Sequence, residues 1–301
     1  MSWFGDRKEN LDTDLSESVN ISFKRLRRNT SLPIQVSEQQ FLTDALQIIG
    51  EAEKNGLKIR ILGALCGYIK NRECDPKIGQ VYRALGRLEG TSTLFTDLDL
   101  MAYSSQRGKI MDFFEKRLKL VPNRYFNMAR GHHRLMYEKP NEFQIDLFLD
   151  RLQYSHNVEF GTKPGNGRLE LDYPTISLAD FVLEKLQIHQ INRKDLVDVI
   201  LLLKTHEVAE HFEKGKVDAG YIAEVLSDDW GFWYDATQNI QKIRNELNSL
   251  AQKLPDHEIV SGRLNQLSTI IDACPKTPRW DARSKTGTKT PWFTEVFEIG
   301  A

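Results

Sequence analysis

Two aspartates alternate with leucines in the segment LFTDLDLM, which covers residues 94–101. Aspartate is uncommon in strands and is seldom buried without a partner, so this pair needs water or positive charge beside it. Side chains alternate across a strand, and Asp97 and Asp99 are therefore expected on the same face. Taken alone, such a pair most often marks an exposed strand edge.

A third aspartate changes this interpretation. In FQIDLFLD, residues 143–150, alternation places Asp146 on the face opposite the run of aliphatic side chains. If this strand neighbours the first, three carboxylates converge on one point. Divalent ions such as Mg²⁺ and Mn²⁺ take oxygen ligands and often bind through a few carboxylates plus substrate phosphates. We therefore predict that Asp97, Asp99 and Asp146 bind Mg²⁺ or Mn²⁺ for phosphoryl or nucleotidyl transfer from a nucleoside triphosphate (NTP).

A lysine lies where an apolar residue is expected. On a helical wheel for residues 177–189, Lys185 falls at the centre of the apolar arc. Lysine is seldom fully buried without a partner, so either its stem reaches out to water or its ammonium meets a triphosphate or an aspartate cluster. In the helix that follows, Asp195 is expected beside the apolar stripe and Asp198 roughly opposite it.

The elements that must position these residues can be read from the same sequence. Ser37 and Gln40 form a capping box before an apolar stripe of helical period. LKIRIL, residues 57–62, alternates as a strand does and runs into a turn at Gly63. Residues 72–90 are polar and contain glycine, which predicts a loop or a short insertion.

Later segments continue the pattern. An amphipathic helix is predicted near residues 110–118, and a hairpin over residues 134–150 with Pro140 and Asn141 near its turn. From Ser177, where a second N-terminal box begins, the period is helical to about Leu250. The predicted fold is α+β, with a mixed β-sheet flanked by helices and then a helical C-terminal domain. The expected divisions are a polar arm at 1–35, an α+β domain at 36–176, and a helical domain with a basic, Trp-bearing tail at 177–301.

Composition excludes several other classes. The 301 residues are 40% hydrophobic and 28% charged with a net charge of −1, so any nucleic acid must be bound through local patches. The three cysteines lack CxxC spacing, which argues against a zinc ribbon and suits a reducing compartment. No apolar run is long enough to span a bilayer, and the N-terminus lacks the apolar core of a secretory signal. We expect a cytoplasmic protein without a membrane partner.

Together these motifs resemble the AbiEii/AbiGii-type nucleotidyltransferases of the polymerase-beta-like superfamily, often the toxins of toxin–antitoxin or phage-defence pairs. RILGALCGYI resembles the first motif of that family, FTDLDL its T-x-D-x-D motif, and FQIDLFLD the strand of its third acid. LADFVLEKLQIHQINRKDLVDVILLL is similar to its third and fourth motifs. The resemblance implies a nucleotidyltransferase-like sheet, catalytic metal ligands at Asp97, Asp99 and Asp146, and substrate-binding roles for Gly63, Ala64, Thr96, Lys185 and Asp195.

The resemblance also implies a reaction, in which NMP moves from an NTP to a tRNA, another RNA or a protein acceptor. It implies an antitoxin protein as a partner. In the first motif the family usually has Gly-Gly or Gly-Ser, whereas this chain has Gly63-Ala64 followed by Leu65. Two alternatives stay open: a nucleotide-binding or interaction module that lacks transfer activity, and a metal-dependent phosphohydrolase that uses the same acids.

Other side chains that could do chemistry are expected to be structural. Adjacent residues on a strand point apart, so the His132-His133 pair is predicted in an exposed loop. His156 is predicted to be a structural histidine, and Trp230 and Trp233 are predicted to pack a helical core. Basic residues in the arm (24–28) and the tail either bind an RNA backbone or are solvated charge.

Overall fold

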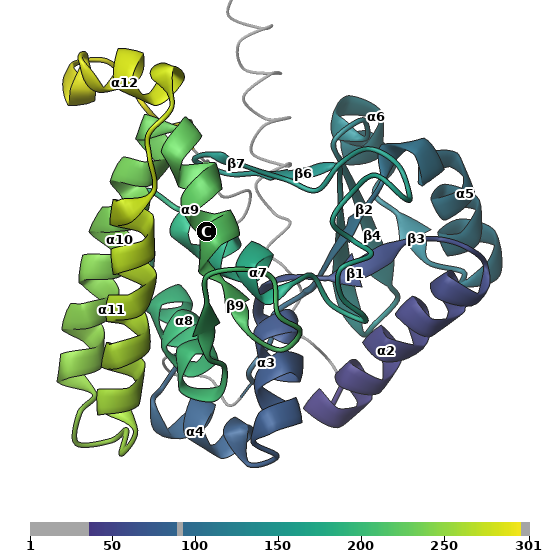
Figure 1. Cartoon of the computed structure of the whole chain (residues 1–301). Coiled ribbons are helices and arrows are strands. Elements are labelled where there is room, and N and C mark those ends of the chain that lie inside the picture. Colours follow the sequence, from purple (N-terminus) through teal and green to yellow (C-terminus); the bar gives the residue numbers. More distant parts are fainter. Residues whose placement is uncertain (1–35, 89–92, 296–301) are drawn as a thin grey trace, which may run out of the picture.

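The computed structural model describes residues 36–88 and 93–295 (Figure 1). The predicted arm and its basic cluster at 24–28 lie outside these described residues. In Figure 1 the sheet lies on one side of the molecule with α2, α5 and α6, and the helices α8 to α11 lie on the other side. Helices α3 and α7 lie between the two groups and contact each other.

A mixed sheet of five strands, in the order β1-β2-β5-β4-β3, supports the first part of the chain. Strand β2 pairs antiparallel with β1 and parallel with β5, and β5 forms an antiparallel hairpin with β4. The predicted hairpin is confirmed, and Asn141 takes a positive φ of 60° in its turn. The strands are β1 (Ile59–Ile61), β2 (Leu98–Ala102), β3 (Val121–Pro122), β4 (Arg134–Lys139) and β5 (Phe143–Leu149).

The first described helix, α2 (Glu38–Lys54), begins where its cap predicts. Ser37 Oγ accepts a hydrogen bond from the Gln40 backbone N–H at 3.2 Å. The apolar stripe faces the sheet, where the Phe41 ring packs edge-on against the Phe143 ring at 4.9 Å between centroids. The local signal and the buried face therefore agree, which is why this element could be predicted from sequence.

The prediction of a loop or insertion over residues 72–90 is wrong for most of that segment. Helix α3 (Gly63–Cys74) runs into it, and α4 (Ile78–Ala84) follows after a short turn. Ile78, Tyr82 and Leu85 are buried with spacings of four and three residues, a helical pattern that the surrounding charges obscure. After β2 come η1 (Ser104–Gln106), α5 (Arg107–Asp112), the π-helical η2 (Phe113–Arg117) and α6 (Arg124–Arg130).

The second part of the chain is mainly helical. Ser177 caps α7 (Leu178–Leu186) as predicted, since its Oγ accepts from the Asp180 N–H at 3.2 Å. A parallel pair of two-residue strands, β8 and β9, interrupts the stretch that was predicted to be helical throughout. Its strands are β8 (Val208–Ala209) and β9 (Val217–Asp218), and the helices after α7 are α8 (Arg193–Thr205), α9 (Ala219–Asp228), α10 (Trp230–Ser249) and α11 (His257–Ala273).

The last described residues fold back onto these helices. They include α12 (Pro278–Ser284) and η3 (Gly287–Lys289), and the Thr277 N–H donates to the Ser227 carbonyl at 3.0 Å. The ribbon β6 (Arg151–Gln153) and β7 (Asn157–Glu159) connects the sheet to α7. In the described part of the chain, no helix is both long enough and apolar enough to cross a membrane. The division at residue 176 stays a prediction, because α3 packs against both α7 and α8.

Candidate metal centre

The structure brings the three predicted aspartates together. One carboxylate oxygen from each of Asp97, Asp99 and Asp146 lies within 4.8 Å of the other two. Asp99 and Asp146 are directly paired across the parallel strands β2 and β5, and Asp97 immediately precedes β2. Residues paired across neighbouring strands project to the same face, so the register itself forces these side chains together.

The charges in this cluster are poorly compensated. Burial raises the pKa of Asp99 well above its ordinary value, and the carboxylates of Asp97, Asp146 and Glu184 raise it further. Burial also raises the pKa of Asp146, although the neighbouring Arg134 opposes that shift. A site of this kind favours either a proton or a cation. Three carboxylate donors within reach of one point suit a hard divalent ion such as Mg²⁺ or Mn²⁺.

Arg134 is a part of this site that the sequence reasoning missed. Its Nη2 donates to Asp146 Oδ2 at 2.6 Å and its Nε donates to Asp146 Oδ1 at 3.2 Å. The guanidinium carbon also lies 4.7 Å from the ring centroid of Phe148 and 5.6 Å from that of Phe126. The register of the hairpin could have indicated this contact, because Arg134 is paired with Phe148 and is therefore a diagonal neighbour of Asp146.

Gly63 lies against the cluster, at the turn between β1 and α3. Its φ of +69° is strained for any residue with a side chain, and a Cβ placed there would lie 2.5 Å from Asp99 Oδ2. The close approach of backbone and carboxylate therefore requires glycine. The Gly63 N–H donates to Glu184 Oε2 at 3.0 Å, so this amide already has a protein partner.

Two further predicted substrate-binding residues flank the aspartates. Ala64 is half-buried in the first turn of α3, next to Gly63. Thr96 is exposed, and its hydroxyl donates to Asp97 Oδ1 at 2.7 Å. Both residues therefore lie beside the cluster, whereas their contact with a nucleotide stays a prediction.

Lys185 and Asp195 also come together, in a second buried cluster. Lys185 Nζ lies 3.0 Å from Asp195 Oδ1, 3.2 Å from Glu184 Oε1 and 3.4 Å from Asp198 Oδ2. The lysine side chain is 6% exposed, so its stem does not carry the charge out to water. Burial opposes the charge of Lys185, but the carboxylates outweigh that effect and raise its pKa.

Asp198, predicted roughly opposite the apolar stripe, also belongs to this buried cluster. This residue is fully buried and also accepts from Arg87, whose Nη2 lies 2.8 Å from Asp198 Oδ2. Asp195 and Asp198 are three residues apart on α8, a spacing that puts both on neighbouring positions of one helix face. A helical wheel did not reveal the burial of Asp198, because it assigns charged residues to the exposed face, whereas this one is buried in ion pairs.

Glu184 connects the two clusters. Its Oε2 accepts from the Gly63 N–H and its Oε1 pairs with Lys185, while its charge contributes to the raised pKa of Asp99. Glu184 therefore links Lys185 to the Gly63 turn, which lies beside the aspartates. The predicted contact of Lys185 with a triphosphate stays a prediction.

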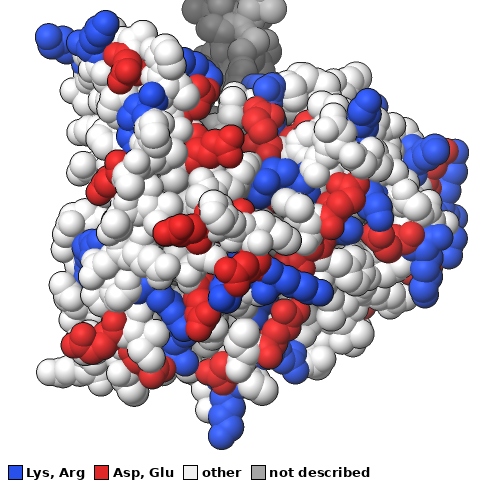
Figure 2. Space-filling model, in the orientation of Figure 1, with Lys and Arg blue, Asp and Glu red and all other residues white. Residues whose placement is uncertain are grey.

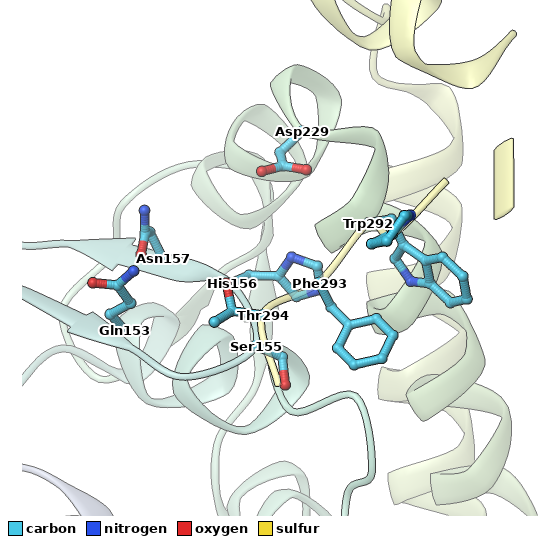
Figure 3. A pocket seen from close by; sticks show the side chains of 9 residues that line it. Gln153, Ser155, His156, Asn157, Asp229, Trp292, Phe293 and Thr294 are labelled. Atoms are coloured by element: carbon cyan, nitrogen blue, oxygen red, sulfur yellow. The ribbon is translucent and has the colours of Figure 1, made fainter. Parts of the chain in front are cut away.

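A separate cavity of about 310 Å³ lies between the ribbon β6–β7 and the folded-back tail (Figure 3). His156 lines it, with its Nε2 2.8 Å from Asp235 Oδ2 and its ring stacked on Phe232. Trp292 closes another side and donates from Nε1 to Asp235 Oδ1 at 3.0 Å. These contacts fix the tail on α10 and agree with the predicted structural role of His156. The cavity is lined by Gln153, Ser155, His156, Asn157, Asp229, Pro291, Trp292, Phe293 and Thr294.

The remaining candidates also lie in structural positions. His132 and His133 are exposed in a turn after α6, as predicted. Trp230 is buried and stacks on Tyr234 at 5.1 Å between ring centroids, as expected for a helical core.

No family model matches this chain, and no curated protein or solved structure matches it either.

Proposed function

We propose that this chain is a metal-dependent nucleotidyltransferase of the AbiEii/AbiGii type, which moves NMP from an NTP to an RNA or protein acceptor and releases pyrophosphate. The observation that carries the proposal is the paired position of Asp99 and Asp146, with Asp97 alongside, on the face that the Gly63 turn approaches. The sequence motifs support the same assignment. The proposal includes a nucleotidyltransferase-like fold for the mixed sheet. A cytoplasmic location and an antitoxin partner belong to this proposal.

Each residue has a distinct task in this proposal. A divalent ion, when bound, supplies positive charge that offsets the triphosphate and polarises the phosphoryl group being transferred. Asp97 and Asp99 hold that ion, while Asp146 completes the ligand set and helps to orient or deprotonate the acceptor hydroxyl. Gly63, which has no side chain, lets the turn approach the Asp99 carboxylate, and Ala64 lies beside it. Both residues are proposed to lie near the phosphates of the bound NTP.

The acceptor is expected to meet the protein through local charge. Figure 2 shows acidic and basic side chains interspersed over the face that it draws. This pattern fits the net charge of −1 and supports recognition by a limited patch rather than by a broadly basic surface.

Label transfer tests the proposal. The full chain is incubated with each α-³²P-labelled NTP and Mg²⁺ or Mn²⁺, in the presence of total tRNA or a protein extract. We expect labelled acceptor with the wild type, loss of at least about a hundredfold in Asp97→Ala, and normal labelling in Asp112→Ala, which removes an exposed aspartate that pairs with Lys116. Label transfer by Asp97→Ala at the wild-type rate would contradict the proposal.

One observation favours a second candidate, a nucleotide-binding module without transfer activity. The Gly63 N–H is already hydrogen-bonded to Glu184, so it is not a ready donor to a phosphate. NTP binding without labelled acceptor, across both acceptor classes, would support that module. Release of free NMP without labelled acceptor would instead support a phosphohydrolase that uses the same acids.

A further inference from the structure

Arg134 occupies both oxygens of Asp146 in the structure, although Asp146 is proposed as a metal ligand. We propose that Arg134 is a resident counterion, which neutralises Asp146 in the metal-free protein and competes with the divalent ion for that carboxylate. This inference rests on the proposed function, because it takes the three aspartates to be the ion site. In this proposal Arg134, which lies outside the recognised motifs, sets the affinity of the site for the divalent ion.

The geometry of the pair supports competition. A guanidinium that donates from Nε and Nη2 to the two oxygens of one carboxylate forms a forked pair, the strongest arrangement these groups adopt. A carboxylate has lone pairs for more partners than two, but a dication beside a fixed cation is repelled. Since Asp146 is largely buried, water screens that repulsion only weakly.

Arg134 also has contacts that do not depend on Asp146. Its guanidinium lies over the ring of Phe148 on β5 and near the ring of Phe126 on α6. Cation–π attraction of this kind holds an arginine without a carboxylate. The Arg134 side chain is 30% exposed, so it can leave Asp146 and still keep part of its surroundings.

A second buried arginine–aspartate pair, joined by one hydrogen bond, provides a control. Arg168 Nε donates to Asp180 Oδ1 at 2.7 Å, and its guanidinium carbon lies 3.4 Å from the Tyr221 ring centroid. Asp180 is fully buried and is also bound by the Ser177 hydroxyl, so this pair joins α7 to the preceding segment. It resembles the Arg134 pair in chemistry but lies outside the aspartate cluster.

Calorimetric titration with Mn²⁺, without nucleotide, measures the competition on the full chain. Arg134→Met is expected to bind Mn²⁺ about tenfold more tightly than the wild type, because the ion no longer displaces a cation. Arg134→Lys keeps the charge and is expected to stay closer to the wild type, while Arg168→Met leaves Mn²⁺ affinity unchanged. Equal or weaker binding by Arg134→Met would overturn the inference.

Thermal unfolding gives a second measurement of the competition. If Arg134→Met folds poorly, the same measurement is made on Arg134→Gln. Without metal the variant is expected to unfold at a lower temperature than the wild type, because Asp146 loses its partner. Saturating Mn²⁺ is then expected to raise its Tm by more than it raises that of the wild type. An equal or smaller Mn²⁺ shift would make Arg134 a fixed structural partner and overturn the inference.

The two proposals fail in different ways. If wild-type Mn²⁺ binding is lost in Asp97→Asn but is not tightened in Arg134→Met, only the counterion role of Arg134 is wrong. If the wild type and all of the variants bind no Mn²⁺, the ion site itself is wrong, and the proposed function fails with it.

Discussion

Asp99 and Asp146 are paired residues on two neighbouring parallel strands, so their carboxylates are crowded by the register of the sheet. Strands hold such groups more firmly than a loop does, and moving either carboxylate away would require a change in strand pairing. The raised pKa values of both residues follow from burial and from repulsion by the neighbouring acids. The fold therefore maintains an arrangement that is unfavourable without a cation.

Gly63 provides a direct test of how closely the turn approaches Asp99. Gly63→Ala is expected to displace the Asp99 carboxylate, weaken Mn²⁺ binding and lower stability by more than the roughly 1–2 kcal/mol of a left-handed alanine. Gly56→Ala is the matched control, since Gly56 has the same φ of +69° but nothing within 4 Å of its added Cβ. Circular dichroism melts and Mn²⁺ titration compare the two. Equal effects of both variants would contradict the close contact at Gly63.

The raised pKa of Asp99 predicts a pH dependence of stability in the metal-free protein. Below the ordinary aspartate pKa of about 3.9 the residue is neutral in both folded and unfolded chains. As pH rises through the raised folded-state pKa, ionisation disfavours the folded state, so the free energy of unfolding falls. Asp99→Asn removes this loss of stability. In urea melts, the free energy of unfolding of the variant should therefore rise relative to that of the wild type as the pH increases. A constant difference between the two proteins would contradict the raised pKa.

Lys185 is predicted to stabilise the fold through its buried carboxylate partners. Lys185→Met leaves Glu184, Asp195 and Asp198 without that cation and is expected to lower the free energy of unfolding by about 3–5 kcal/mol. Lys116→Met, which removes one partner of an exposed ion pair, is expected to leave the free energy of unfolding almost unchanged. Urea denaturation measures both. Unchanged stability of Lys185→Met, together with weaker NTP binding, would favour the phosphate contact implied by the family resemblance.

Asp235 is predicted to hold the C-terminal tail in place. Burial opposes the charge of Asp235, but hydrogen bonds from His156, Trp292 and His189 outweigh it and lower the pKa of Asp235. The stability that these hydrogen bonds contribute is therefore present above the ordinary aspartate pKa. It is lost as the pH falls through the lowered pKa of the folded state. Asp235→Asn is expected to expose the segment after Pro275 to trypsin and to cost about 2–3 kcal/mol. The exposed Asp272→Asn serves as the control. Equal rates of tail cleavage, followed by mass spectrometry, would contradict this role.

Local signals were enough to predict several elements from the sequence. The caps at Ser37 and Ser177 and the hairpin turn near Asn141 each depend on residues adjacent in the chain. The convergence of the acids was predictable because alternation fixes the face of Asp146 and leaves only the neighbouring strand to be guessed.

Contacts between distant segments were not predictable in the same way. The bond from the Gly63 N–H to Glu184 joins residues 121 positions apart, and Arg87 meets Asp198 across 111 positions. No local pattern encodes such pairs, because buried ion pairs interrupt the apolar periodicity by which helices are recognised. Helix α4 was missed for a related reason, since its charged neighbours hide a short apolar stripe.

Asp97, Asp99 and Asp146 are proposed to hold a divalent ion, and anomalous diffraction at the manganese edge tests this most directly. Crystals of the full chain grown with Mn²⁺ and a non-hydrolysable NTP analogue are expected to show an anomalous peak bounded by these three carboxylates. The same peak should be absent in Asp99→Asn. A peak elsewhere, or no peak at a saturating Mn²⁺ concentration in the wild type, would contradict the claim.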